Sequence, residues 1–541
     1  MRRYCLLGVA MLALCGPAVR PAATQVQPTF QVHPAAMDAH MRFLSSDLLE
    51  GRAPATRGGR LAAEYIAAVY RSLGLEPAAA DSSYFQPVAL VGMMPQPTFT
   101  WGKGGATTTL AFRDDYVAWG ERPEADITAA GEVVFVGYGI RAPEWQWDDF
   151  KGTDLRGKIL LMLVNDPGMA DSTVFLGDIL TYYGRWTYKL EEAARQGAAG
   201  VVLIHTTESA TYPWEVVRGS WSVEQLKLDQ PQSPSLAFAG WVTEQVARDA
   251  LTRAGFPLDS LTRAAARRDF SPVATGIQTS VRVQSALRRV QSVNVVGRLR
   301  GSDPGRGLAS QVVLFTSHWD HKGIGPVVRG DSIYNGAEDN ASGIAAMLAA
   351  AQALTGATPR PSRSILFVAT TAEESGLLGS EAYVQRPLVP LAQTAAVVNI
   401  DVTNVRGATE DISALGLDRS SLGPVFETAA RAERLTVESR PDVRGAFFRS
   451  DHFPFARAGV PALSLRPGVR FVGRPSGWGE EQETKYNAER YHQPSDEYRT
   501  DFRIDGMAQQ VRVAVRVALA VANSPSLPRW LPTSEFQRPS P

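Results

Sequence analysis

The sequence predicts an α/β protein whose mainly parallel sheet is sandwiched between helices, with a smaller α/β unit inserted into it. From residue 291 onward, short apolar runs alternate with helical patterns, which is typical of a parallel sheet covered on both faces. The chain has 541 residues, too many for one compact core, and its 44% hydrophobic and 20% charged content is that of a folded globular protein. The expected strands span residues 293–296, 312–316, 364–370, 395–400 and 462–465.

The first 23 residues have the pattern of a secretory signal. Arg2 and Arg3 precede an apolar segment from Cys5 to Cys15, and small residues and prolines follow. The apolar segment is too short to span a bilayer. We therefore expect an exported protein, periplasmic or secreted, with lipid anchoring as the less favoured alternative. Because both cysteines lie in this leader, any metal in the mature chain must be held by His, Asp and Glu.

The mature chain divides into four parts. Residues 24–123 open the main domain, residues 124–285 form the inserted unit, residues 286–524 complete the main domain, and residues 525–541 are a Pro-rich tail. The inserted unit has no cluster of acids and histidines with metal-ligand spacing, so we expect a structural or access-controlling role for it. Elsewhere we expect helices within 33–75, strands within 84–118, strands at 131–140, 157–164 and 200–204, and helices at 188–196 and about 505–523.

The stretch from residue 312 to residue 343 carries the first two candidate ligands. Its opening apolar run predicts a buried strand, and His318 follows at the end of that strand. A Gly-rich loop then leads to Asp339, and residues 341–354 form an Ala- and Leu-rich helix. Open α/β sheets build their sites at the carboxyl ends of strands in this way.

Three further candidates occupy comparable places. Glu374 follows the strand at 364–370, Asp401 follows the strand at 395–400, and His492 lies in a late loop. A lone His or Asp at one such position is more often a structural residue. Five such groups at the same edge of one sheet reverse that expectation.

These five residues match the needs of a two-metal centre. Paired metals about 3.5 to 4 Å apart need a bridging carboxylate, with one His and one carboxylate for each metal. We expect Asp339 to bridge, His318 and Asp401 to hold the first metal, and Glu374 and His492 to hold the second. Nitrogen and oxygen ligands suit two Zn²⁺ ions per chain, with Mn or Co as substitutes.

Two acids beside the ligands have natural roles. Asp320, two residues after His318, is expected to accept the second imidazole N–H and so fix the tautomer of that ligand. Glu373 is expected to take a proton from the attacking water and return it to a leaving amine. Side chains of neighbouring residues diverge in an extended segment, so Glu374 can bind metal while Glu373 faces the substrate. The alternative for Glu373 is a solvated neighbour without a role.

Six short motifs contain the candidate residues and occur in a fixed order along the chain. They are His318-x-Asp320, Asp339-Asn340-Ala341-Ser342-Gly343, Glu373-Glu374-x-Gly376-x-x-Gly379-Ser380, Asn399-x-Asp401, Ser450-Asp451-His452 and Tyr491-His492. Together they resemble the two-zinc bacterial aminopeptidase family, whose fold is shared by the glutamate carboxypeptidase and transferrin-receptor ectodomains. The N-terminal segment at 43–52 also resembles the opening of its secreted members, and the inserted unit resembles a protease-associated domain.

The resemblance implies the ligand set above, Glu373 as general base, Asp320 as the residue that orients His318, and a water between two zincs as the nucleophile. It also implies that Tyr491 stabilises the oxyanion of the tetrahedral intermediate. His321 and His452 lie in motif positions too, but no ligand place remains for them, so we expect structural or substrate-lining roles.

The expected function is therefore that of a metallo-aminopeptidase acting on peptides with a free N-terminus. A dipeptidase or carboxypeptidase of the same fold is the first alternative, because exopeptidase polarity depends on loops such as 466–490. A one-zinc glutaminyl cyclase or a non-catalytic receptor-like protein is disfavoured by the complete ligand set. The formal net charge of zero gives no field that would recruit nucleic acid or an anionic membrane.

Overall fold

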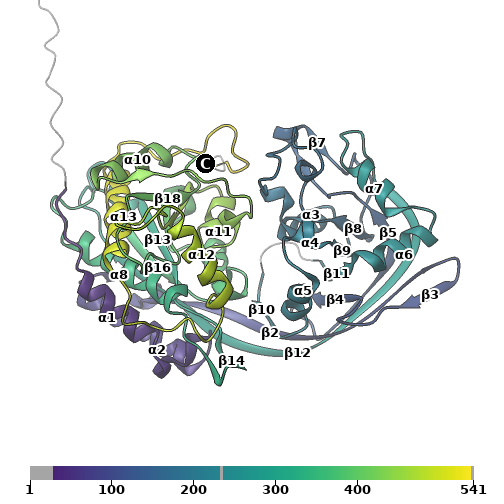
Figure 1. Ribbon diagram of the computed structural model, residues 1–541, viewed down its shortest axis with the longest axis horizontal. Coiled ribbons are helices and arrows are strands. Elements are labelled where there is room, and N and C mark those ends of the chain that lie inside the picture. The colour runs from purple at the N-terminus through teal and green to yellow at the C-terminus, as the bar shows by residue number, and fades with distance from the viewer. Residues whose placement is uncertain (1–27, 232–235, 538–541) are drawn as a thin grey trace, which may run out of the picture.

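The computed structural model describes residues 28–231 and 236–537, so the predicted signal at 1–23 lies outside the described residues. Figure 1 shows two lobes joined along one side by two long strands, β2 (Phe85–Lys103) and β12 (Val273–Leu299). None of the helices in the described part of the chain is both long and apolar enough to cross a membrane.

The first lobe is built on a mixed sheet that is mostly parallel at its centre. β13 runs parallel to both of its neighbours, β16 and β17, and β17 runs parallel to β20. The outer strands β18 and β12 run antiparallel. In spatial order the strands are β19 (Thr436–Val437), β18 (Asp411–Leu415), β20 (Ala462–Arg466), β17 (Thr394–Ile400), β13 (Val312–His318), β16 (Ser364–Thr370) and β12.

Helices cover both faces of this sheet, which confirms the predicted fold class. Val313 and Phe315 of β13 point into one core with α8 and α13, while Val312 and Leu314 point into the opposite core with α11. Burial on both faces explains why these strands are continuous apolar runs. The helices of this lobe are α1 (Pro34–Leu44), α2 (Arg57–Ser72), α8 (Ser342–Thr355), α9 (Leu378–Gln385), α10 (Leu422–Ala432), α11 (His452–Arg457), α12 (Trp478–Glu489) and α13 (Asp505–Asn523).

The second lobe continues the same sheet beyond β12. Its four central strands are parallel, and β4 closes the edge in the antiparallel direction. The strands are β5 (Asp126–Phe135), β8 (Ile159–Leu163), β9 (Gly200–His205), β11 (Phe238–Thr243) and β4 (Tyr116–Gly120). The helices are α3 (Trp186–Arg195), α4 (Thr207–Ala210), α5 (Trp214–Trp221), α6 (Glu244–Arg253) and α7 (Leu258–Ala265).

Two segments differ from the expectation. A strand was predicted only at 293–296, but β12 continues back to Val273, and the predicted boundary at residue 285 falls inside it. Alternate residues of β12 are buried because successive side chains of a strand point to opposite faces, and one face of this strand packs into a core. The Gly-rich loop before Asp339 contains a hairpin of β14 (Gly323–Val328) and β15 (Asp331–Tyr334).

The core prediction concerns the central strand. Replacing fully buried Leu314 by Ala should lower the free energy of unfolding by about 2–5 kcal/mol, because the cavity left in a two-sided core cannot collapse. The matched control is Leu48→Ala, whose side chain is 71% exposed and whose loss should change stability by less than about 0.5 kcal/mol. Denaturant titration of both variants measures the difference, and equal midpoints would contradict this account of the core.

Candidate metal centre

The predicted ligands come from elements that end at the same edge of the sheet. His318 is the last residue of β13, Asp401 directly follows β17, and Glu374 lies in the turn after β16. Asp339 lies in a single π-helical turn, η7 (Ala337–Ala341), just before α8, and His492 lies in the loop after α12. Neighbouring parallel strands bring their carboxyl ends together, so residues far apart in sequence meet here.

Asp339 lies at the centre of the cluster, with one carboxylate oxygen toward each histidine. Its Oδ1 is 3.3 Å from His318 Nε2, and its Oδ2 is 3.2 Å from His492 Nε2. His318 Nε2 is also 3.3 Å from Asp401 Oδ1, and His492 Nε2 is 3.0 Å from Glu374 Oε2. The structure therefore brings all five predicted ligands together, in the two groups that the sequence predicts on either side of Asp339.

The electrostatics of the cluster fit bound cations. Burial alone would lower the pKa of His318, but the carboxylates around it, Glu373 first, raise that pKa well above its usual range. Burial, followed by repulsion from Asp401 and Glu374, raises the pKa of Glu373. Several buried carboxylates facing one another are unfavourable unless positive charge compensates them. Imidazole and carboxylate donors at this spacing are the ligands that zinc binds, so the residues present fit the metal.

Hydrogen bonds from the surrounding chain fix the ligands in place. The Asp496 carboxylate accepts the backbone N–H groups of Glu338, at 3.1 Å, and of Asp339, at 3.0 Å. Ser450 Oγ donates to Asp401 Oδ2 at 2.6 Å. Support of this kind orients ligands before a metal arrives.

A buried arginine that the sequence analysis did not single out ties two of the site loops together. The Arg52 guanidinium donates to the carbonyl oxygen of Trp319 at 2.9 Å and to those of Asn335 and Gly336 at 2.5 and 3.0 Å. Burial lowers its pKa to about 10. No local pattern distinguishes such an arginine from a surface one, because its carbonyl partners on these two loops lie hundreds of residues away in sequence.

Asp320 does not make the contact that was predicted for it. His318 Nδ1 lies 3.1 Å from the backbone carbonyl oxygen of Asp320, whereas the nearer Asp320 carboxylate oxygen is 4.0 Å away. The carboxylate turns instead toward the backbone N–H of Glu373, which donates to it at 3.2 Å. The backbone carbonyl of Asp320 therefore contacts the imidazole, and the Asp320 carboxylate accepts a hydrogen bond from the turn that carries Glu373.

That turn also corrects the expected backbone. Glu373–Ser375 is a single 3-10 turn entered through Ala372 at a positive φ of 54°, not an extended segment. Successive side chains of a 3-10 turn point about a third of a revolution apart, so the two glutamates still diverge. Glu374 contacts His492, while Glu373 lies 4.0 Å from His318 on the other side of the cluster.

The other three residues that the motifs singled out, His452, His321 and Tyr491, lie in different surroundings. His452 is buried against Phe447, and burial lowers its pKa to about 3, so it is part of the core. His321, for which no ligand place was expected, lies with Nδ1 2.5 Å from Glu374 Oε1 and forms a tight group with Asp339 and Glu374. The ring of Tyr491 stacks on that of His492 at 3.8 Å and is 43% exposed, on the open side of the cluster.

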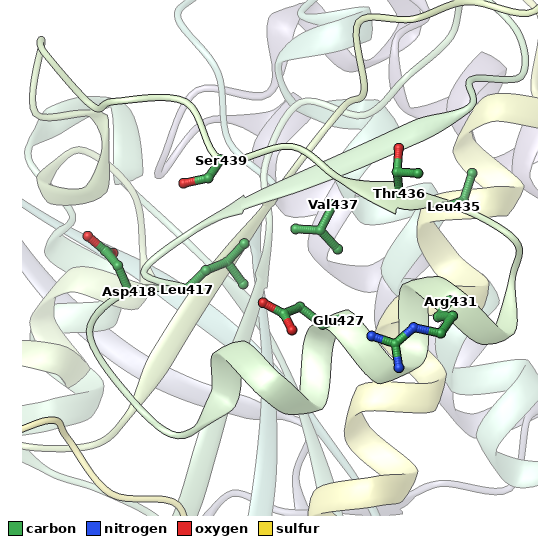
Figure 2. A pocket seen from close by; sticks show the side chains of 8 residues that line it. All are labelled: Leu417, Asp418, Glu427, Arg431, Leu435, Thr436, Val437 and Ser439. Atoms are coloured by element: carbon green, nitrogen blue, oxygen red, sulfur yellow. The ribbon is translucent and has the colours of Figure 1, made fainter.

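A cavity of about 500 Å³ lies elsewhere in the first lobe, between α10 and β19 (Figure 2). Its polar lining side chains include Asp418, Glu427 and Arg431. None of the clustered His and acidic residues lines it.

Comparison with known proteins agrees with this description. Residues 294–515 match the sequence profile of Peptidase family M28, and this part of the chain carries every predicted ligand. The chain is 30% identical over 220 residues to aminopeptidase YwaD of Bacillus subtilis. This alignment covers 40% of this chain and 42% of that protein. It is 24% identical over 410 residues to a glutamate carboxypeptidase 2 homolog of Caenorhabditis elegans. This alignment covers 64% of this chain and 48% of that protein.

The chain thus spans about half of the length of these curated relatives. Among solved structures, the aminopeptidase from Aneurinibacillus sp. strain AM-1 aligns with a TM-score of 0.46 and 18% identity, over 94% of this chain and 98% of that one.

The support that Asp496 gives to Asp339 leads to a prediction. In Asp496→Asn the amide has one oxygen for two backbone N–H groups, so η7 loses its fixed geometry and zinc affinity should fall about 10- to 100-fold. Competition with a chromogenic chelator measures the affinity, and circular dichroism checks that the variant is folded. The control is Asp501→Asn, an exposed carboxylate bonded to Arg499, which should bind zinc as the wild type does. Equal affinities for the two variants would contradict the role assigned to Asp496.

Proposed function

We propose that the protein is a zinc-dependent exopeptidase, and specifically an aminopeptidase that hydrolyses the N-terminal peptide bond. The observation that carries the proposal is the position of Asp339, whose two oxygens face His318 and His492 at 3.3 and 3.2 Å. A carboxylate shared in this way is what a two-metal hydrolase needs. The M28 match over residues 294–515 supports a peptidase rather than another metal hydrolase.

The proposed centre holds two Zn²⁺ ions, with Mn or Co as substitutes. His318 and Asp401 would bind the first ion, Glu374 and His492 the second, and Asp339 both. When bound, the zinc ions would supply Lewis acidity, which lowers the pKa of water and polarises the peptide carbonyl. His321 lies against Glu374 opposite His492, and we assign it the role of a hydrogen-bonding neighbour of the second site.

The chain's own residues then carry the proton transfers. The Glu373 carboxylate, half-buried and 4.0 Å from His318 Nε2, would take a proton from the attacking water and give it to the departing amine nitrogen. Burial raises the pKa of Glu373, which favours a group that both takes up and returns a proton. The Tyr491 hydroxyl, on the open side of the cluster, would donate to the oxyanion of the tetrahedral intermediate.

The surroundings of the site belong to the same proposal. We infer that the protein is exported, with residues 1–23 as its signal, and that the inserted unit at 124–285 is a protease-associated-like domain that controls access. A relative from Mycobacterium tuberculosis carries the name probable lipoprotein aminopeptidase LpqL and is 28% identical over 232 residues, which supports an exported location. The substrate is a peptide with a free N-terminus.

Replacing Glu373 by Gln tests the mechanism. The amide cannot accept the proton, so turnover should fall by several orders of magnitude while both zinc ions stay bound. Turnover assays and metal analysis of the same preparation measure the rate and the zinc content. The control is Glu64→Gln, an exposed residue of α2, which should keep wild-type turnover. Near-normal turnover of Glu373→Gln would overturn the mechanism.

A comparison of peptide ends tests the reaction class. We expect hydrolysis of peptides with a free N-terminus whether or not the C-terminus is amidated, no hydrolysis of N-acetylated peptides, and loss of all activity with a chelator. Cleavage that needs a free C-terminus would establish the carboxypeptidase alternative, which the name of the nematode relative makes the natural rival. Cleavage of dipeptides only would establish a dipeptidase.

A further inference from the structure

A lysine ammonium lies on one of the proposed zinc ligands. Lys322 Nζ is 2.9 Å from Glu374 Oε2, and this same oxygen is 3.0 Å from His492 Nε2. The Lys322 side chain is 35% exposed and that of Glu374 is 6% exposed, so the pair is at the inner wall of the site rather than on a free surface. Lys322 follows His321 directly, on the loop that leaves β13.

The other half of the cluster has no such neighbour. In the described residues, no lysine or arginine lies within ion-pair distance of Asp401 or Asp339, whose ion-pair contacts are with histidines. The free oxygen of Asp401 accepts a hydrogen bond from Ser450, a neutral group. The two proposed metal sites therefore share one bridging carboxylate, and in the described residues only the Glu374–His492 site has a lysine on one of its ligands.

We propose that Lys322 makes the Glu374–His492 site the weaker of the two metal sites, so that zinc fills the His318–Asp401 site first. An ammonium on the ligand oxygen repels a divalent ion that binds the same carboxylate, and it already neutralises part of the charge that attracts the ion. This inference rests on the proposed two-metal centre and adds an order of filling to it.

The same contact stabilises the protein without metal. Glu374 and Asp339 are buried together, both facing His492. Lys322 reduces the repulsion between these carboxylates when the second site holds no zinc. Loss of the ammonium should therefore have opposite effects, with lower stability of the metal-free protein and tighter binding of the second zinc.

Zinc titrations of the full chain in competition with a chromogenic chelator test the proposal. Wild type should bind two zinc ions with separate affinities. In Lys322→Met, which keeps the length and removes the charge, the weaker dissociation constant should fall about tenfold or more, while the tighter one changes by less than about twofold. Lys322→Arg keeps the charge and should behave as the wild type does.

A matched control separates this effect from the general loss of a lysine. Lys158 makes an ion pair of the same length, 2.9 Å to Glu132 Oε2, with a side chain that is 37% exposed, but in the second lobe. Lys158→Met should leave both zinc affinities unchanged. Thermal unfolding of metal-free protein gives an independent measurement, in which Lys322→Met should melt below the wild type and gain more from excess zinc.

Crystals grown with one equivalent of zinc provide a direct view of the filling order. Anomalous scattering should place the ion beside His318 and Asp401 in the wild type and divide it between both sites in Lys322→Met. If Lys322→Met binds two zinc ions with wild-type or weaker affinity, the inference is wrong while the metal centre stands. If the wild type binds no zinc, the metal centre and the inference both fall.

Discussion

The structure depends on the compensation of buried negative charge at one edge of a sheet. Asp339, Glu374 and Asp401 meet there with Glu373 behind them, in a region from which water is largely excluded. Burying carboxylates without compensating positive charge costs far more free energy than the hydrogen bonds of any one loop contribute. The histidines and Lys322 compensate part of this negative charge, and bound divalent ions would compensate the rest. The fold around the cluster is arranged to keep these charges together despite their repulsion.

Part of the support for these charged residues comes from hydrogen bonds to their backbone. Asp496 accepts the N–H groups of Glu338 and Asp339, which leaves both Asp339 oxygens directed at the histidines. Asp320 does the same for the N–H of Glu373. Arg52 fixes the two loops on either side of the cluster through their carbonyl oxygens. In each of these cases a charged side chain bonds to a peptide group and so fixes the backbone near the ligands.

The sequence predicted the strands and the positions of the five converging residues because both follow from short-range patterns. A two-sided buried strand is an apolar run, and the residue at its carboxyl end is found by counting, as for His318 after 312–316 and Asp401 after 395–400. The same reasoning failed for Asp320, since the choice between a side-chain and a main-chain acceptor depends on where the Glu373 N–H lies in space. It passed over Lys322 and Arg52 for a similar reason, because their partners Glu374 and Gly336 are near only in the folded chain. The length of β12 was underestimated because its first half forms a strand by pairing with β2 and β5, which lie far away in sequence.

The second lobe contacts the segment that supports a ligand, which links the two lobes to the chemistry. Tyr182, just before α3, packs against Phe448 at 6.0 Å and Phe453 at 5.6 Å between ring centroids. These two phenylalanines flank Ser450, whose hydroxyl donates to Asp401. Arg457, on the same side of the first lobe, pairs with Glu191 of the second lobe and with Glu381 of its own. β2 and β12 run unbroken between the lobes, and the segment that carries Ser450 is a further place where the two lobes meet. The Asp401 carboxylate therefore receives its hydrogen bond from a segment that packs against the second lobe.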